Sequence, residues 1–322
     1  MSSKLLEAVK EAKTIGISGH IRPDGDCVGS TSGFYHYVKE NYPDKEVKYF
    51  LQPFATGIAE VIDVPPVSSY EEYKDYVFDL FVSLDSSTSD RLGEAEVIFN
   101  NAKKTLVLDH HKTNIGFGDI NIVVPDACSA CEVLYDNLEA DKISLSAAKS
   151  IYLGIVHDSG VFKYNSVTGH TMEIAGRLMD KGIEISSLID RSFYAKTWNQ
   201  TKLFAWALEK ASITDDGLIT YTLLTLEDLK KYNCTSMDTD GIVEQLRLVD
   251  TAEVSIFVRQ DGEEEYKFSL RGKIGIVDLS EIATIYGGGG HFMAAGFSVN
   301  GKLEDIFPSV LSEIQNRLKS KL

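Results

Sequence analysis

The length and charge of the chain limit its class before any single residue is considered. The 322 residues suffice for two domains of ordinary size, and 43% of them are hydrophobic, which excludes general disorder. Asp and Glu number 48 against 32 Lys and Arg, so the formal net charge is −16. This balance argues against a broad basic surface for duplex nucleic acid or an anionic membrane. The net charge does not exclude a small anionic ligand that binds in a local pocket.

The cysteines and the first residues argue against a secreted or membrane protein. Four cysteines are too few for a disulfide framework, and Cys128 and Cys131 lack a second pair at zinc-site spacing. We therefore expect small buried thiols near a helix start rather than a zinc or redox site. The chain starts without an apolar signal region, and no segment approaches the roughly 18 apolar residues of a membrane span. These features predict a cytoplasmic protein without a membrane partner.

Short β-branched and aromatic segments alternate with longer helical ones in the first half of the chain. A helix is expected over residues 28–41, and strands are expected over 14–18, 46–51, 77–84 and 105–108. Such alternation is typical of a mostly parallel sheet covered by helices. From about residue 129 to 211, apolar residues recur at three- and four-residue spacing, which predicts a predominantly helical region.

The strand pattern restarts after Ile213. Helices are expected over residues 239–249 and 303–322, and strands over 217–224, 252–258, 266–271 and 297–299. No proline-rich linker marks a boundary, so the restart itself defines it. We place a first α/β domain at residues 1–190, a helical connector at 191–212 and a smaller α/β domain at 213–322.

Carboxylate and imidazole side chains follow three of the expected strands in the first domain. They are, in chain order, His20, Asp24, Asp26, Asp85, Asp109, His110 and His111. Ligands of an open parallel sheet bind outside the carboxyl ends of its strands, so we expect these side chains in one crevice. Taken alone, an aspartate after a strand, such as Asp85, is usually no more than a turn residue or a helix cap, and Asp24 and Asp26 could likewise be turn residues around Gly25.

Asp158 adds a fourth element to this set. It is expected at the C-terminal end of an apolar helix, where the negative end of the helix dipole disfavours a carboxylate. A nearby cation would offset that disadvantage. For the preceding residue, His157, we expect a structural role, because adjacent side chains point in different directions.

Several carboxylates in one place repel each other unless cations compensate their charge. Imidazoles in the same set suit a manganese-like or zinc-like ion better than calcium. The candidate ligands are too many for one tetrahedral ion: His20, Asp24, Asp26, Asp85, His110 and Asp158. They suffice for two ions about 3.5–4 Å apart, bridged by a carboxylate and a water. The sequence therefore predicts metal-assisted hydrolysis of a phosphate ester.

Five segments, in order, resemble the DHH phosphoesterases that carry a C-terminal DHHA1 domain. They cover residues 20–30, residue 85 with 91–93, and residues 109–111, 154–160 and 286–297. Together they span almost the whole chain. The resemblance implies an N-terminal parallel-sheet DHH domain, a smaller C-terminal α/β DHHA1 domain and hydrolysis of phosphate esters.

The resemblance also implies roles for the residues of the first domain. It implies two metal sites that share Asp85, formed by His20, Asp24 and Asp85 and by Asp26, Asp85, His110 and Asp158. Asp109 is expected to orient an imidazole, and His111 to contact the scissile phosphate or assist the leaving group. The family metal is usually manganese, with magnesium or cobalt as substitutes.

In the second domain, the resemblance implies the residues that bind substrate. Backbone N–H groups of Gly288, Gly289 and Gly290, with His291, are expected to approach an anion; the run fits neither a dinucleotide nor a P-loop motif. Arg271 is expected to pair with a phosphate rather than to be an exposed strand-end arginine. Gly272 follows it where family members often have serine, so a hydroxyl donor is missing.

Within the family, the chain length and the two-domain arrangement are most similar to those of the bacterial enzymes that degrade very short RNA and dephosphorylate 3′-phosphoadenosine 5′-phosphate. We therefore expect short single-stranded RNA, the dinucleotide pApA or single nucleotides as substrates, held in a crevice between the domains. The alternatives are a cyclic-di-AMP phosphodiesterase, a manganese-dependent inorganic pyrophosphatase and a non-catalytic nucleotide sensor. Relatives often dimerise through the first domain, so a homodimer is a further expectation.

Overall fold

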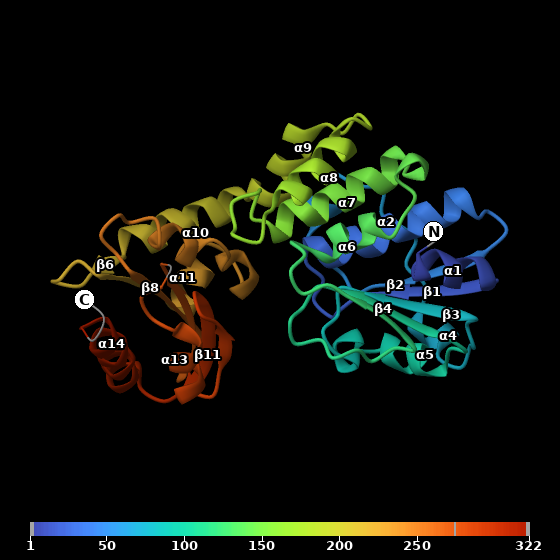
Figure 1. Ribbon diagram of the computed structural model, residues 1–322. Coiled ribbons are helices and arrows are strands. Elements are labelled where there is room, and N and C mark those ends of the chain that lie inside the picture. Colours follow the sequence, from blue (N-terminus) through green and yellow to red (C-terminus); the bar gives the residue numbers. More distant parts are fainter. Residues whose placement is uncertain (1–2, 274, 320–322) are drawn as a thin grey trace. The chain divides into compact units, whose positions relative to one another are not determined.

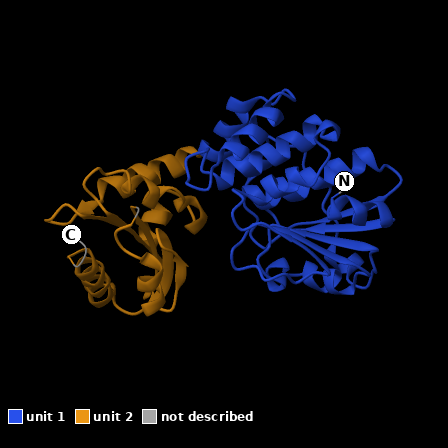
Figure 2. Cartoon of the chain, in the orientation of Figure 1, with its two compact units in different colours: residues 1–195 blue, residues 196–322 orange. Residues whose placement is uncertain are grey.

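The structure is a computed structural model that describes residues 3–273 and 275–319. The chain divides into two compact units, residues 1–195 and 196–322 (Figure 2). Each unit has its own sheet with helices and its own hydrophobic clusters, which confirms the expected two-domain α/β class. Within the described ranges, no helix is long and apolar enough to cross a bilayer.

A five-stranded parallel sheet lies at the centre of unit 1, in the order β2-β1-β3-β4-β5. Its strands are β1 (Thr14–Ser18), β2 (Glu46–Phe50), β3 (Leu80–Leu84), β4 (Thr105–Asp109) and β5 (Ile120–Val123). Strands β3 and β4 are buried along their whole length, because helices and loops cover both faces of the sheet. The first four strands confirm the sequence prediction. Strand β5 was not predicted, because four half-exposed residues on a sheet edge give a weak pattern.

Helices cover both faces of this sheet (Figure 1). Helices α2, α6 and α7 lie over one face, and α4 and α5 lie over the other. The helical segments of unit 1 are α1 (Lys4–Glu11), α2 (Gly25–Asn41), α3 (Thr56–Ala59), α4 (Tyr70–Tyr73), η1 (Ser89–Leu92), α5 (Ala95–Asn101), α6 (Ala130–Asp136), η2 (Ala140–Lys142), α7 (Leu145–Asp158), α8 (Gly169–Met179), α9 (Ile185–Ile189) and the π-helical η3 (Asp190–Tyr194). The predominantly helical region expected after residue 129 is therefore confirmed.

Small residues bring α2 and α7 into close contact. A Cβ atom on Gly29 would lie 2.5 Å from the carbonyl oxygen of Ser150, and one on Gly33 would lie 2.8 Å from the Ile151 side chain. A Cβ atom on Gly154 would lie 2.7 Å from a carboxylate oxygen of Asp26. The N-terminal end of α2 and the C-terminal end of α7, which carry predicted site residues, are thereby held side by side.

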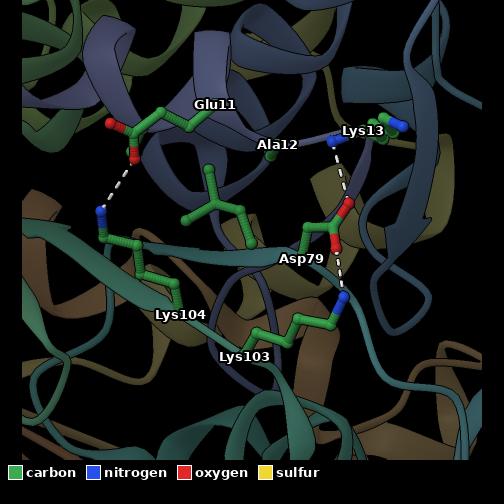
Figure 3. Close-up of a pocket in the computed structure, with 8 residues that line it drawn as sticks. Glu11, Ala12, Lys13, Asp79, Lys103 and Lys104 are labelled. Carbon is green, nitrogen blue, oxygen red and sulfur yellow. Dashed lines mark hydrogen bonds and ion pairs between the residues drawn. The ribbon is translucent and has the colours of Figure 1, made fainter.

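A hollow of about 490 Å³ lies at the amino-terminal ends of β1, β3 and β4, away from the predicted site residues (Figure 3). Its charged side chains pair with each other across the rim. Lys103 contacts Asp79 at 2.8 Å, and Lys104 contacts Glu11 at 3.2 Å. The Glu11–Lys104 pair joins α1 to the start of β4, and the Asp79–Lys103 pair joins the starts of β3 and β4, so the hollow is best explained as a structural edge of the sheet.

Unit 2 contains a mixed six-stranded sheet in the order β10-β11-β9-β8-β7-β6. Its strands are β6 (Ser212–Ile213), β7 (Ile219–Leu224), β8 (Val254–Gly262), β9 (Glu265–Gly272), β10 (Gly289–His291) and β11 (Ala294–Asn300). Among its described strands, β7 and β8 pair in parallel and the other neighbours pair antiparallel. The central strands β7, β8, β9 and β11 were expected, whereas the two short edge strands were not, because two or three residues show no periodicity.

Two helical layers cover the sheet of unit 2. The helical segments are α10 (Trp198–Glu209), α11 (Leu226–Lys231), η4 (Ser236–Thr239), α12 (Ile242–Leu246), α13 (Leu279–Ile285) and α14 (Leu303–Lys319). One hydrophobic cluster joins the sheet to α13 and α14, and another joins it to α10, α11 and α12. The sequence predicted α14 up to residue 322; residues 320–322 lie outside the described ranges.

Asp228 connects α10 to α11. Its carboxylate accepts hydrogen bonds from Trp206 Nε1 (2.6 Å), from Lys210 Nζ (2.7 Å) and from the backbone N–H and hydroxyl of Thr225 (2.9 and 3.0 Å). Burial alone would raise the pKa of this carboxyl, but Lys210, Thr225 and Trp206 lower it to about 2. The charged form is therefore the one that stabilises unit 2.

We expect Asp228→Asn to lower the free energy of unfolding by roughly 1.5–3 kcal/mol at neutral pH, because charge-assisted hydrogen bonds are lost. The pKa of Asp228 in the folded state, about 2, lies below its pKa in the unfolded chain. The wild type should therefore lose the stabilisation from Asp228 as the pH falls from the unfolded-state pKa to the folded-state pKa. The variant should not show this loss. Urea unfolding across acid pH measures both, with Asp215→Asn, at an exposed carboxylate, as the control that changes little.

Candidate active site

Two histidines present the same ring nitrogen to a cluster of carboxylates at the carboxyl ends of the strands in unit 1. The Nδ1 atom of His20 lies 2.9 Å from the carbonyl oxygen of Ile21, and that of His110 lies 3.3 Å from the carbonyl oxygen of Ala127. Each Nδ1–H therefore donates to a backbone carbonyl. This turns Nε2 of both rings toward the carboxylates, where it can bind a metal ion once the ring is neutral.

Asp85 lies between these two imidazoles. Its Oδ2 is 3.5 Å from His20 Nε2, and its Oδ1 is 3.7 Å from His110 Nε2. Asp85 follows β3 with a positive φ of 53°, a conformation that costs energy for a residue other than glycine. Its Oδ1 is buried without a hydrogen-bond partner. The backbone is thus held in a strained form that delivers an unsatisfied oxygen to the cluster.

The other predicted ligands lie around the same histidines. His110 Nε2 is 3.8 Å from Asp26 Oδ2 and 3.3 Å from Asp158 Oδ2, and His20 Nε2 is 3.8 Å from Asp24 Oδ1. All six residues predicted as metal ligands are therefore brought together. Asp24 is also the N-cap of α2, where Oδ1 accepts from the backbone N–H groups of Asp26 and Cys27, both at 3.1 Å. The helix-cap explanation therefore holds for Asp24, and the same carboxylate also faces the cluster.

The backbone of α6 binds the carboxylate of Asp26. The N–H groups of Ala130 and Cys131 donate to its two oxygens at 2.6 and 3.0 Å. Helix α6 begins here because Ser129 is its N-cap and accepts from the backbone of Glu132. Sequence reasoning missed these donors. The available signal was the Ser129–Glu132 spacing of a helix start beside the Cys128–Cys131 pair.

Without a cation, the carboxylates of the cluster disfavour each other's charge. Burial, with the charges of Asp85 and Asp158, raises the pKa of Asp26 well above its usual value. Burial and Asp85 also raise the pKa of Asp158 to about 7, against the opposing effect of His110. Burial alone would lower the pKa of His20, but Asp24 and Asp85 raise it to about 10. The cluster therefore calls for added positive charge.

The donor set fits divalent metal ions. Two ligand atoms that share one ion at about 2.1 Å lie roughly 3–3.5 Å apart, close to the distances between the imidazole nitrogens and carboxylate oxygens here. Three overlapping groups have ligand atoms within 4.8 Å of one another: His20, Cys27 and Asp85; Asp85, His110 and His111; and Asp26, His110 and Asp158. Burial raises the pKa of the Cys27 thiol, which disfavours the thiolate that metal binding requires. Oxygen and imidazole ligands remain.

His111 differs from the other two histidines because a carboxylate holds its ring. Its Nδ1 lies 2.8 Å from Oδ1 of the fully buried Asp109. The second oxygen of Asp109 accepts from Asn114 Nδ2 at 2.7 Å, and the same amide group donates to the carbonyl of Ser86 at 2.9 Å. Asp109 therefore orients His111 and leaves its Nε2 free. Asn114 was not predicted, because a single polar residue in a loop has no sequence signal of its own.

The remaining cysteines and His157 do not extend the ligand set. Cys128 and Cys131 are buried at the start of α6, as expected for small thiols, and neither is in a candidate metal group among the described residues. Burial lowers the pKa of His157 to about 4, so this imidazole is neutral. Its ring lies against Gly25 rather than among the carboxylates.

In unit 2, Arg271 and His291 lie in one row across the sheet. His291 pairs with Ala294 on the neighbouring strand, and Ala294 pairs with Arg271 on the next. Directly paired residues share a face, so only the small Ala294 lies between the two side chains. The guanidinium of Arg271 is already engaged: Nε and Nη2 lie 3.0 and 2.9 Å from Glu244 Oε1. Glu244, which sequence reasoning missed, therefore adjoins the predicted phosphate-binding arginine.

The glycines of residues 287–290 have different structural roles. The N–H groups of Gly287 and Gly288 donate to the carbonyls of Thr284 and Ala283, where they end α13. A Cβ atom on Gly288 would lie 2.3 Å from the carbonyl oxygen of Gly296, and one on Gly290 would lie 2.5 Å from that of Ala294. Gly289 is exposed, and a Cβ atom there would meet nothing within 4 Å. Packing thus accounts for Gly288 and Gly290 but not for Gly289.

Comparison with protein families defines the class of the chain. The model of the DHH family, N-terminal domain, matches residues 14–155, and that of the DHHA1 domain matches residues 216–320. The chain belongs to the DHH family of phosphoesterases, in the form with a C-terminal DHHA1 domain. It is thus a hydrolase of phosphate esters, and the resemblance found in the sequence is confirmed.

Similarity to individual relatives extends over both units. A probable bifunctional oligoribonuclease and PAP phosphatase of Streptococcus mutans is 30% identical over 98% of each chain. The bifunctional oligoribonuclease and PAP phosphatase of Bacillus subtilis is 27% identical over 93% of each chain. An exopolyphosphatase-related protein from Bacteroides fragilis has a TM-score of 0.88 at 25% identity, with 98% of this chain and 96% of that chain covered.

The Asn114 amide gives a test of the Asp109–His111 arrangement. We expect Asn114→Ala to lower the free energy of unfolding by roughly 1–3 kcal/mol, because buried Asp109 and the Ser86 carbonyl both lose a donor. Turnover should fall as well, since Asp109 then holds His111 less firmly. Urea unfolding in EDTA and activity assays measure the two effects. Asn121→Ala, which removes a similar but exposed side chain from the edge strand β5, is the control and should leave activity unchanged.

Proposed function

We propose that this protein hydrolyses phosphate esters of short single-stranded oligoribonucleotides and of 3′-phosphoadenosine 5′-phosphate with the help of two divalent metal ions. Manganese is the proposed ion, with magnesium or cobalt as substitutes. The observation that carries the proposal is the convergence of six potential ligands in one cluster, with Asp85, whose Oδ1 is unsatisfied, between His20 and His110. The names of the relatives in Streptococcus mutans and Bacillus subtilis support the choice of substrates.

The proposed ligand set divides around Asp85. His20, Asp24 and Asp85 would hold one ion, and Asp26, Asp85, His110 and Asp158 would hold the other. Divalent ions in such a pair lower the pKa of water and stabilise negative charge on a phosphoryl group. The choice of manganese rests on mixed carboxylate and imidazole ligands, which suit it better than calcium.

The protein's own groups then orient and protonate the substrate. Asp109 fixes the Nδ1–H of His111 at 2.8 Å, so the free Nε2 can hold a proton for the leaving oxygen of the ester. Burial around Asp26 and Asp85 restricts water and strengthens every charge interaction in the cluster. His111, at 41% side-chain exposure, is the most accessible histidine of the cluster and the one a substrate meets first.

Unit 2 is proposed to bind the part of the substrate that does not react. Arg271 on β9, with the exposed Gly289 and His291 on β10, flank strand β11 and offer a guanidinium, a backbone and an imidazole to a second phosphate or a base. A substrate phosphate would compete with Glu244 for Arg271. A limited set of contacts of this kind favours a short ligand over a long polyanion, in keeping with the net charge of −16.

The two-metal proposal is tested at Asp85. Asp85→Asn should abolish turnover and weaken Mn²⁺ binding at least about 100-fold, because the shared ligand loses its charge. In EDTA the same variant should be at least as stable as the wild type, since one of the repelling carboxylates is gone. Isothermal titration calorimetry and thermal unfolding separate these effects. Asp141→Ala, at an exposed carboxylate, is the control, and near-normal turnover by Asp85→Asn would contradict the proposal.

The substrate is tested with a panel of phosphate compounds in the presence of Mn²⁺. We expect release of mononucleotide from dinucleotide RNA and pApA, and release of phosphate from 3′-phosphoadenosine 5′-phosphate, measured by chromatography. Cyclic di-AMP and pyrophosphate should be hydrolysed much more slowly. Preference for either would replace the proposed substrate class, and the absence of any product would favour a nucleotide sensor.

The glycines of unit 2 give a separate test of substrate binding. Gly289→Ala should raise KM for pApA with little change in the melting temperature, because the added methyl group occupies open space where the ligand approaches. Gly288→Ala should instead lower the melting temperature, because its Cβ would clash with the backbone of Gly296. Steady-state kinetics and thermal unfolding of both variants check this contrast. An unchanged KM for Gly289→Ala would remove this residue from the binding surface.

A further inference from the structure

His157 touches the chain between two of the proposed metal ligands. Its ring packs on the Cα atom of Gly25, so closely that a Cβ atom there would lie 2.1 Å from the ring carbon Cγ and 2.4 Å from Nδ1. Gly25 is the first residue of α2 and stands between Asp24 and Asp26. Glycine is required at this position because the imidazole fills the space a side chain would need. Any shift of the ring therefore displaces the turn that carries both carboxylates.

The other side of the ring is held by the last segment of unit 1. His157 Nε2 lies 3.1 Å from the hydroxyl oxygen of Ser192, and that hydroxyl donates to the carbonyl of Leu188 at 2.8 Å. Because the single hydroxyl proton is used there, the imidazole is the donor in the bond to Ser192. Phe193 packs edge-on against the ring, with centroids 5.3 Å apart. Ser192 and Phe193 thus hold the imidazole in place on one side, and its other side packs against Gly25.

The segment that holds His157 is itself unusual. Residues Asp190–Tyr194 form a π-helical turn, a geometry that is rare and often found at functional sites. The segment is packed from another side by α3, where a Cβ atom on Gly57 would lie 2.5 Å from the carbonyl oxygen of Arg191. It lies near the end of unit 1, which closes with Ala195, one residue before unit 2 begins at Lys196.

We propose that His157 is a positioning residue of the metal centre, which fixes the Asp24–Asp26 turn through Gly25 and is itself fixed by Ser192. This inference rests on the proposed function, since it concerns the residues that would hold the metal ions. It assigns to Ser192, which is hydrogen-bonded to His157 and Leu188, an effect on metal affinity that passes through His157. The end of unit 1 and the proposed metal centre are then coupled through the contacts of His157 with Ser192 and Gly25.

Metal affinity of the full-length chain tests the inference. Wild type, His157→Ala, Ser192→Ala and the double variant are titrated with Mn²⁺ by calorimetry after removal of bound ions. We expect a dissociation constant about tenfold or more higher for His157→Ala, as for loss of other groups that support ligands, and a smaller rise for Ser192→Ala. In the double variant, the loss of Ser192 should add nothing, because it acts only through His157. A merely structural contribution would add independently.

Two further variants keep the test decisive if His157→Ala folds poorly. His157→Phe keeps a flat ring against Gly25 but cannot donate to Ser192, so it should bind Mn²⁺ like Ser192→Ala. His170→Ala removes a histidine of the same unit that hydrogen-bonds Asp136 at 2.9 Å, and it should bind like the wild type. Circular dichroism in EDTA verifies the fold of each variant.

The outcomes separate this inference from the proposed function. If the wild type and His170→Ala fail to bind Mn²⁺, the proposed metal centre itself is wrong. If both bind, but folded His157→Phe and Ser192→Ala bind within twofold of the wild type, only the positioning role of His157 is overturned. Additive losses in the double variant would also overturn it, since Ser192 would then act independently of His157.

Discussion

The repulsion between carboxylates at the carboxyl end of the parallel sheet dominates unit 1. Asp26 and Asp85 are buried, and the nearby Asp158 is held in the same field, so burial and mutual repulsion raise the pKa of Asp26 and Asp158. Such a cluster is expensive unless positive charge enters it. The surrounding structure does not lower this electrostatic free energy by moving the carboxylates apart. It holds them together, as expected of a site that is stabilised by a bound cation.

The backbone around the cluster prevents the carboxylates from moving apart. Asp85 keeps a positive φ, the N–H groups of α6 hold the carboxylate of Asp26, and backbone carbonyls fix the rings of His20 and His110. Each donor or strained angle reduces the rotational freedom of a proposed ligand in the absence of an ion. Such preorganisation increases affinity because little conformational entropy remains to be lost.

The sequence predicted the part of the site that follows from strand topology. His20, Asp85 and His110 come directly after adjacent parallel strands, and strands of this kind bring their carboxyl ends to one edge. Residues that act through long-range contact were not predicted. Asn114 bonds to Ser86 across 28 positions, and Glu244 pairs with Arg271 across 27, without any periodic pattern. The edge strands β5, β6 and β10 were missed for a related reason, since their few residues are defined by a neighbour rather than by their own composition.

The hold of α6 on Asp26 has a consequence for the synthesis of the chain. The N–H groups that bind this carboxylate come from residues 104 and 105 positions later, and Asp158 follows later still. On the proposed ligand set, a chain that is still leaving the ribosome has no complete metal centre until almost all of unit 1 has been made and folded. On that ligand set, copies that end before Asp158 lack a ligand of the proposed metal centre, so hydrolytic activity is expected only when synthesis has reached unit 2, the unit proposed to bind the substrate.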